Sequence, residues 1–174
     1  MSDRVRFSCN GAPVDVIIAE GETLLSVLRE RLRLTSVKDG CAPQGQCGCC
    51  TVLVDGDARV ACVTPAQRVE GRTVTTVEGL DAEVRDRLAG AFVATGGSQC
   101  GFCTPGIVMR SAAAITKGRT GPVELDRALA AHLCRCTGWL TVYEAVERAA
   151  AGPPPATRPA DAAGRRATLE GGVP

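Results

Sequence analysis

The stretch GCAPQGQCGCCTV, residues 40–52, places four cysteines within ten positions and intersperses them with glycines. Three kinds of site use thiols this densely: a disulfide-linked loop, a zinc site and an iron–sulfur cluster. Glycine permits positive φ values and a close approach of the backbone, so Gly40, Gly45 and Gly48 would let N–H groups point toward an anionic centre. The remainder of the chain decides between the three.

The composition narrows the class of protein. The chain has 174 residues, ten cysteines and a formal net charge of +1, and aromatic residues make up 3% of it. It therefore offers neither a basic surface nor a set of stacking side chains for nucleic acid. The first ten residues hold no apolar run of signal-peptide length, and no stretch approaches the roughly 20 apolar residues of a membrane span. We expect a cytoplasmic protein, in which clustered thiols stay reduced and bind metal rather than each other.

The single histidine, His132, limits the kinds of metal site. A zinc site of two cysteines and two histidines needs one more histidine, and so does a Rieske cluster. Any metal must therefore be held almost wholly by sulfur. We expect His132 to have a structural role rather than to act as a general base, and we expect no catalytic residue in this chain.

Alternating apolar residues predict strands in the first half of the chain. Asn10-Gly11 and Asp55-Gly56 are typical of tight hairpin turns. Four or five strands with one helix packed across them indicate a ferredoxin-like β-grasp domain, which we place at residues 1–79. The predicted elements are a hairpin over residues 5–18, a helix around 24–32, a hairpin over 51–63 and a strand over 73–77.

The apolar period lengthens to that of a helix from about residue 80 onward. We expect an all-α four-helix domain over residues 80–151, which makes the fold class α+β. Residues 152–174, rich in proline, glycine and alanine, are expected to form an extended tail because they cannot bury a core. The predicted helices begin near Val84, at Pro105 with Thr104 as its N-cap, at Pro122 and near Thr141. Gly96-Gly97 ends the first, Gly118 ends the second, and the third runs through Leu133.

Eight cysteines form two groups of four, one in each half. The first group has the spacing C-x5-C-x2-C-x11-C, close to the C-x4-C-x2-C and distant fourth cysteine of plant-type two-iron ferredoxins. In the second group, a C-x2-C pair directly precedes a predicted helix N-terminus, whose dipole favours an anion, and helices rather than zinc-ribbon hairpins surround a C-x-C pair. The predicted ligands are Cys41, Cys47, Cys50 and Cys62, and Cys100, Cys103, Cys134 and Cys136.

Two cysteines remain outside these groups. Cys49 stands between Cys47 and Cys50, which already supply the usual pair of ligands, and Cys9 shares a strand face with apolar neighbours. We expect both to be small buried packing residues.

Four segments carry a resemblance to a known family: GQCGCCTVLVDG, ACVTP, QCGFCTPG and CRCTGW. Together they resemble the small iron–sulfur subunit of the molybdenum hydroxylases, the xanthine-oxidase-like family, over nearly all of residues 5–150. The resemblance implies two [2Fe-2S] clusters, one in each domain, and it implies that Gln99 and Cys136 contact a molybdopterin cofactor held by a large subunit. The family usually has a tyrosine where Trp139 stands, and one residue fewer between Cys41 and Cys47.

The resemblance also implies partners. The chain is expected to be the electron-transfer subunit of an oxidoreductase, in a hetero-oligomer such as a dimer of heterotrimers whose medium subunit carries FAD. The residues themselves leave three alternatives: a free-standing double-cluster ferredoxin-type carrier, a zinc-bound interaction module and a disulfide scaffold. The substrate is not readable, because substrate-contacting residues would lie on another chain.

Overall fold

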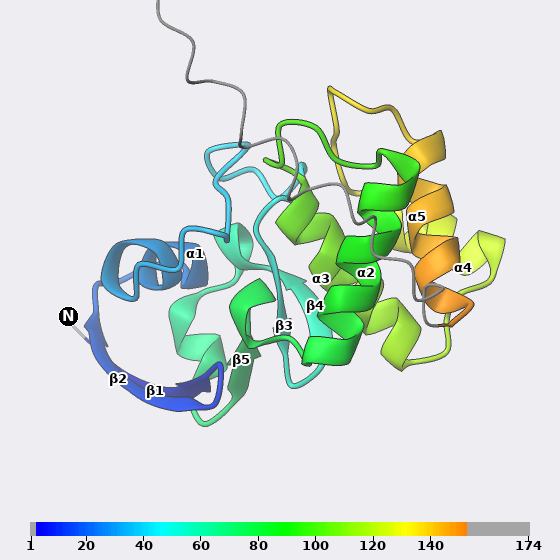
Figure 1. Cartoon of the computed structure of the whole chain (residues 1–174). Helices are drawn as coiled ribbons and strands as arrows, with labels where there is room; N and C mark the ends of the chain where they lie inside the picture. Colours follow the sequence, from blue (N-terminus) through cyan, green and yellow to red (C-terminus); the bar gives the residue numbers. More distant parts are fainter. Residues whose placement is uncertain (1–2, 153–174) are drawn as a thin grey trace, which may run out of the picture.

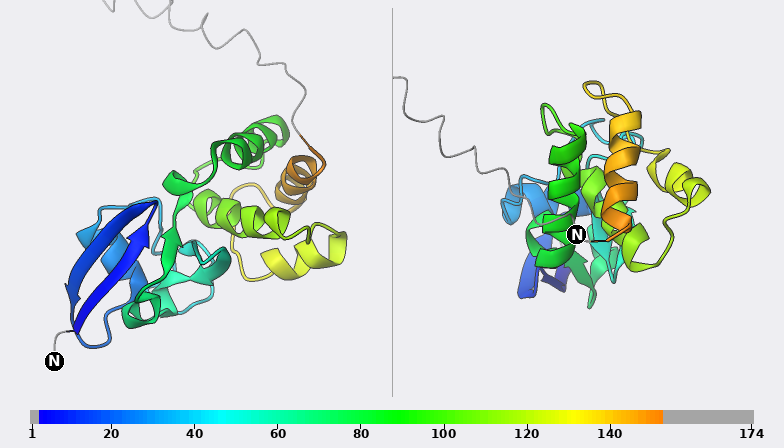
Figure 2. Two further views of the ribbon diagram at one scale, coloured as in Figure 1. Left: turned by 90° about the horizontal axis from the view of Figure 1, so that it is seen from below. Right: turned by 45° about the vertical axis from the view of Figure 1, so that its right-hand side comes forward.

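The computed structural model describes residues 3–152, so the segment predicted to form an extended tail lies almost wholly outside the described residues. A five-stranded sheet and the helices α2 to α5 occupy opposite sides of the molecule (Figure 1). The view from below separates the two halves, with the strands on one side and the helices on the other (Figure 2). The predicted α+β class is confirmed.

The sheet has the strand order β2-β1-β5-β3-β4. β1 and β2 form the predicted N-terminal hairpin, and Asn10 and Gly11 at its turn have φ values of 51° and 82°. β1 also pairs in parallel with β5, so the last strand lies beside the first. The strands are β1 (Asp3–Cys9), β2 (Ala12–Ile18), β3 (Thr51–Val54), β4 (Asp57–Val60) and β5 (Thr73–Thr75).

One helical segment packs within the sheet half. α1 (Leu24–Ser26) is a single α-helical turn that continues into the π-helical segment η1 (Val27–Arg31). Leu24 and Leu28 are fully buried in the core of this half. The helix predicted around residues 24–32 therefore exists, but it widens after its first turn.

The second hairpin is shorter than predicted. β4 ends at Val60, and the predicted continuation is the 3-10 turn η2 (Ala61–Val63). The Ala61 N–H donates to the carbonyl oxygen of Cys50 at 3.2 Å, which holds this turn against the cysteine loop. Because the chain leaves the strand here, the turn brings Cys62 back toward that loop.

The last strand is shorter as well. β5 ends at Thr75, because the N–H of the buried Thr76 donates to Oδ1 of Asn10 at 2.9 Å instead of extending the ladder. The 3-10 turns η3 (Ala66–Val69) and η4 (Val77–Gly79) complete this half of the chain.

The helical half holds α2 (Ala82–Thr95), α3 (Thr104–Thr116), α4 (Pro122–Leu129) and α5 (Leu140–Ala150), four helices as predicted. Asp81 caps α2 by accepting the N–H groups of Glu83 and Val84. Gly96 ends the same helix in the left-handed region, with φ of 66°. Both ends of α2 thus follow from local sequence signals.

Two details of the predicted helices are wrong. The N-cap of α3 is Cys103 rather than Thr104, so Pro105 is the second helical residue. α4 ends at Leu129, and Leu133, predicted to continue its apolar face, lies beyond it with 61% of its surface exposed. The chain leaves the helix early because the Leu133 N–H donates to the carbonyl oxygen of Cys47, 3.1 Å away in the cysteine loop.

Each half has its own buried core, and the cysteine loop contributes to both. Cys50 packs with the sheet residues, whereas Cys47 and Cys49 pack with the side chains of α2 to α5. α3 lies against β3 and so joins the two cores (Figure 2). Among residues 3–152, no helix is long and apolar enough to cross a membrane.

Candidate metal centres

The first predicted ligand group forms around the loop that precedes β3. Cys41, Cys47 and Cys50 lie in this loop, and η2 supplies Cys62 from the far end of the second hairpin. The Cys50 and Cys62 thiols interact with each other, Cys62 also interacts with Cys41, and Cys41 with Cys47. These pairwise interactions connect all four predicted side chains of this group.

Backbone donors surround the outermost sulfur of the group. The Gln44 N–H donates to Sγ of Cys41 at 3.4 Å. Hydrogen bonds from the N–H groups of Cys47, Gln46 and Gln44 lower the pKa of Cys41 to about 6. Burial instead raises the pKa of Cys50 to about 12. Inward-pointing N–H groups stabilise negative charge on sulfur, as an anionic cluster requires.

Glycines shape the loop as the sequence predicted. Gly45 and Gly48 have φ values of 69° and 68°, a region that side chains rarely adopt. At Gly40 the backbone approaches its neighbours closely, as expected, since a Cβ there would lie 2.9 Å from Sγ of Cys47. Ala42 also has a positive φ, 50°, within the five-residue gap after Cys41. The loop thus forms a tight cradle whose walls leave no room for added side chains at Gly40.

The second predicted group forms between helices. Sγ of Cys136 lies 3.5 Å from Sγ of Cys100, and the Cys103 and Cys134 thiols interact with each other. Burial opposes ionisation of Cys134, but hydrogen bonds led by the Thr137 hydroxyl, 3.2 Å from Sγ, lower its pKa to about 7. Cys103 is the N-cap of α3. The sequence predicts it directly before the N-terminus of this helix, and the two positions agree to within one residue.

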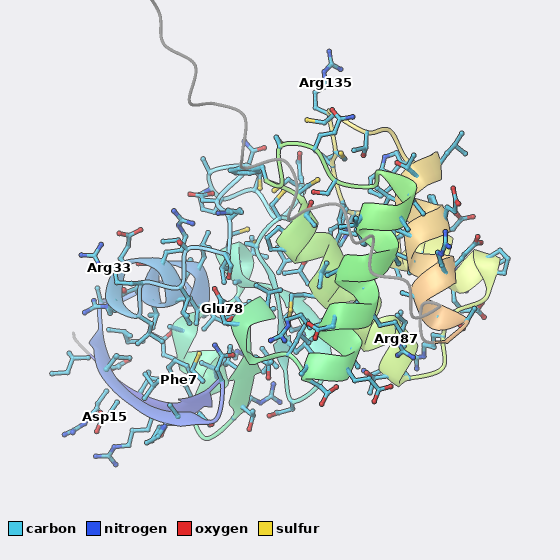
Figure 3. The ribbon with its side chains drawn as sticks, in the orientation of Figure 1. Phe7, Asp15, Arg33, Glu78, Arg87 and Arg135 are labelled. Carbon is cyan, nitrogen blue, oxygen red and sulfur yellow. The ribbon has the colours of Figure 1, made fainter. Side chains whose placement is uncertain are left out.

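The two groups differ in exposure. Cys103 is buried and Cys134 is partly buried, whereas Cys100 and Cys136 are exposed together with Gln99. One edge of the second group is therefore open to solvent beside the Gln99 amide. Arg135, between two predicted ligands, points away from the body of the molecule (Figure 3).

The two leftover cysteines are buried. Cys9 packs in the sheet core, and burial raises its pKa to about 11. Cys49 packs in the helical core with Sγ 3.5 Å from the Cys47 carbonyl oxygen, and burial raises its pKa to about 12. The expected packing role agrees with both positions.

His132 is buried, 2% exposed, and its Nε2 lies 3.2 Å from the carbonyl oxygen of Gly106. Burial lowers its pKa to about 4. The sequence indicated a structural role but not the contact with α3, since the two residues are far apart in the chain. A glycine inside the predicted helix, Gly106, was the one available signal of a close approach.

The donor set decides which metal chemistry the two groups fit. Each offers four thiols and no other ligand type, which suits either four-cysteine zinc or a [2Fe-2S] cluster. Within residues 3–152, no three ligand-type side chains form a set that would hold a single ion. The N–H donors to Cys41 and the helix N-terminus at Cys103 match the net negative charge of a cluster.

Two family descriptions match the chain in succession. Residues 7–73 match the family described as "2Fe-2S iron-sulfur cluster binding domain", and residues 76–147 match "[2Fe-2S] binding domain". The two matches cover the two halves of the structure and one cysteine group each.

Whole proteins are similar over most of their length. The chain is 40% identical over 151 residues to the xanthine dehydrogenase iron-sulfur-binding subunit of Escherichia coli O157:H7, covering 83% of this chain and 94% of that one. It is 38% identical over 148 residues to the isoquinoline 1-oxidoreductase subunit alpha of Brevundimonas diminuta, covering 84% and 97%.

Solved structures share the fold. Quinoline 2-oxidoreductase from Pseudomonas putida 86 superposes with a TM-score of 0.77 at 33% identity, over 86% of this chain and 94% of that chain. Aldehyde oxidoreductase from Desulfovibrio gigas superposes with a TM-score of 0.78 at 35% identity, over 86% of this chain but 17% of that one. In the latter, the similar part is a fraction of a much longer polypeptide.

Proposed function

The chain belongs to the family of small [2Fe-2S] iron–sulfur subunits of molybdenum hydroxylases, and on this premise we propose how its residues serve electron transfer. We assign one cluster to Cys41, Cys47, Cys50 and Cys62, and the other to Cys100, Cys103, Cys134 and Cys136. When bound, such clusters accept and release one electron at a time. We take residues 1–79 and 80–151 as the two cluster-binding domains.

The observation that carries this proposal is a backbone hydrogen bond that connects the segments holding the two thiol groups. The Leu133 N–H donates to the carbonyl oxygen of Cys47 at 3.1 Å, and Leu133 is the neighbour of Cys134. A ligand of the first group is therefore one hydrogen bond and one peptide away from a ligand of the second. This arrangement favours an electron conduit over two unrelated structural sites.

The exposed edge of the second group suggests where the molybdopterin-binding subunit docks. Gln99, Cys100 and Cys136 are exposed together, and an amide and a thiolate can hydrogen-bond a pterin edge. Large apolar side chains lie exposed beside ligands of this group: Phe102 is 44% exposed and Leu133 61%. Exposed apolar side chains around a polar contact are typical of a protein interface.

The remaining assignments follow from family and chemistry. We propose that Cys41, partly exposed in its loop, marks the side from which electrons leave to a medium FAD-binding subunit or another acceptor. The assembly would be a hetero-oligomer such as a dimer of heterotrimers. We propose a cytoplasmic location, since none of the ten cysteines forms a disulfide and a reducing compartment keeps thiols available to bind metal.

Iron and acid-labile sulfide analysis of the purified full chain tests the assignment. We expect four irons and four sulfides per chain and two distinguishable EPR signals after reduction. Cys62→Ala should remove one signal and Cys134→Ala the other, while Cys9→Ala, the matched control, should keep both. A colourless zinc protein, or a stoichiometry of two irons, would contradict the proposal.

A further inference from the structure

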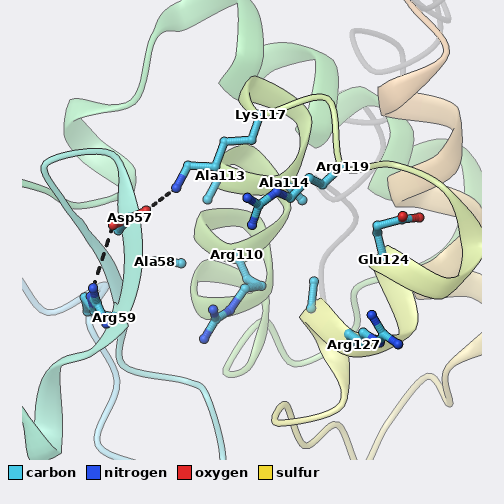
Figure 4. Close-up of a pocket in the computed structure, with 11 residues that line it drawn as sticks. Asp57, Ala58, Arg59, Arg110, Ala113, Ala114, Lys117, Arg119, Glu124 and Arg127 are labelled. Atoms are coloured by element: carbon cyan, nitrogen blue, oxygen red, sulfur yellow. Dashed lines mark hydrogen bonds and ion pairs between the residues drawn. The ribbon is translucent and has the colours of Figure 1, made fainter.

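A basic hollow lies at the end of α3 opposite the cysteines. Its volume is about 510 Å³, within the range of small-molecule sites. The floor is made of alanines from β4, α3 and α4, whose short side chains leave the space open (Figure 4). The walls carry long charged side chains: Asp57, Arg59, Arg110, Lys117, Arg119, Glu124 and Arg127.

The charges in the hollow do not cancel. Five cationic side chains face two carboxylates, a difference of +3. Asp57 is already engaged: Lys117 bonds to its carboxylate, and Nη2 of Arg59 lies 3.7 Å from Oδ2. Among the described residues, the side chains of Arg110, Arg119 and Arg127 have no hydrogen-bond or ion-pair partner.

Arg110 has the least ordinary environment of the three. It projects from the middle of α3 and is half-buried, and its Nε is fully buried without a hydrogen-bond acceptor among the described residues. Burial, followed by the charge of Arg59, lowers the pKa of Arg110. A buried N–H donor is normally paired, so the protein itself leaves this arginine incompletely satisfied, and Arg110 is also one of the residues that line the hollow.

The helix ends do not account for this arrangement. Cations gather at helix C-termini, which explains Lys117 at the end of α3 and Arg127 in the last turn of α4. Arg110 lies inside a helix and Arg59 on a strand, where no such attraction acts. Arginine side chains that line one hollow from separate elements are instead a common receptor for phosphate oxygens, which guanidinium groups bind in pairs.

We propose that this hollow binds a diphosphate-bearing anion, held by the guanidinium groups of Arg110, Arg119 and Arg127. A single carboxylate would satisfy one guanidinium fork, whereas a diphosphate presents enough oxygens for three. The volume exceeds that of the bare anion, so an organic remainder can lie over the alanine floor. The residues that line the site include none of the predicted cysteine ligands.

Calorimetric titration of inorganic pyrophosphate into the cluster-loaded full chain tests the site, at low ionic strength because salt screens exposed charges. We expect one site per chain. Arg110→Gln and Arg119→Gln should each weaken binding about tenfold or more. Arg68→Gln removes an equally charged side chain that is exposed on η3, outside the hollow, and should leave the affinity unchanged.

The cluster absorption of each variant shows whether it has folded, and the exposed Arg119 keeps the test valid if Arg110→Gln does not fold. ADP that binds more tightly than pyrophosphate would place an organic remainder in the hollow, and equal affinity would identify free diphosphate. The proposal is overturned if pyrophosphate does not saturate a site or if Arg68→Gln weakens binding as much. It is also overturned if the arginine variants lose only partner-subunit association, which would identify an acidic protein segment.

Discussion

The imidazole of His132 and the backbone of Gly106 meet at the joint of the two halves, with Nε2 3.2 Å from the carbonyl oxygen. The same nitrogen lies 3.4 Å from Oγ1 of Thr51 on β3, and that hydroxyl donates to the Gly48 carbonyl at 2.7 Å. One buried side chain thus contacts the sheet half and α3 while sitting two residues before Cys134. The metal-binding loops are positioned by this contact as well as by their own sequence.

Gly48→Ala should damage this joint. An added Cβ would lie 2.5 Å from Cδ2 of His132 and 2.7 Å from the Ala131 carbonyl oxygen, and φ at Gly48 is +68°. Gly71→Ala is a matched control, since φ there is +69° and nothing lies within 4 Å. We expect Gly48→Ala to cost about 1–3 kcal/mol more unfolding free energy than the control, by overpacking alone. Urea unfolding measures the loss of unfolding free energy, and iron content shows whether the clusters persist. Equal losses in Gly48→Ala and Gly71→Ala would refute the clash.

Substituting the adjacent Cys49 and Cys50 one at a time tests which of the two is a ligand. Both are buried, but Cys50 interacts with Cys62 inside the first group, whereas Cys49 packs in the helical core. Cys49→Ala should keep four irons and lose about 1 kcal/mol of stability from reduced burial. Cys50→Ala should keep only the cluster of the second group, because one ligand of the first is gone. Iron content and EPR spectra distinguish the two variants. If Cys49→Ala lost a cluster, Cys49 would be the ligand and Cys50 the packing residue.

Local signals explain what the sequence could predict. The Asn10-Gly11 turn and the Gly96 stop each depend on neighbours a few residues away. The thiol groups were predictable because their spacing records the geometry of the loop. Candidate ligands could therefore be chosen from spacing alone, without knowledge of distant contacts.

Long-range contacts explain what was missed. α4 ends before Leu133 because that N–H donates to Cys47, a residue 86 positions earlier in the chain. The hydrogen bond between His132 and Gly106, like the basic hollow around Arg110, joins segments whose proximity only the packing of α3 creates. Sequence patterns describe one element at a time and do not place such pairs.

Glu22 holds the start of α1 and η1 in place. Its carboxylate accepts from Arg31 Nε at 2.9 Å and Nη2 at 2.8 Å, and from Ser26 Oγ at 3.1 Å, and its side chain is 9% exposed. Glu22→Gln should therefore lower the unfolding free energy by about 2 kcal/mol at neutral pH. Glu30→Gln, whose side chain is 67% exposed, should cost less than about 0.5 kcal/mol. Urea titrations compare them, and equal costs would contradict the assignment.

The same carboxylate gives a pH dependence of definite sign. Hydrogen bonding led by Arg31 lowers the pKa of Glu22 from 4.5 to about 2. A group with a depressed folded-state pKa contributes fully above its unfolded value and loses its contribution as pH falls through the folded one. The stability gap between wild type and Glu22→Gln should therefore be constant down to about pH 5.5 and shrink below about pH 4.5. A gap that widens at pH 4 would contradict this linkage.

Gln99 should act on electron transfer without affecting cluster binding. Its side chain is exposed beside Cys100, so Gln99→Ala leaves no cavity, and both clusters and assembly with the partner subunits should persist. If its amide bonds the pterin edge, the loss of one hydrogen bond, about 0.5–1.5 kcal/mol, should slow electron transfer from the molybdenum centre about two- to tenfold.

Stopped-flow bleaching of the cluster absorption in the assembled complex measures that rate. Gln67→Ala, which removes an amide from η3, is the control and should leave the rate unchanged. An unchanged rate in Gln99→Ala would remove Gln99 from the electron path, while lost assembly would make it an interface residue only. The isolated chain should turn over no substrate, because the molybdenum centre that would oxidise it is expected on the large subunit. Turnover by this chain alone would therefore overturn its role as an electron conduit, whatever the rate in the Gln99 variant.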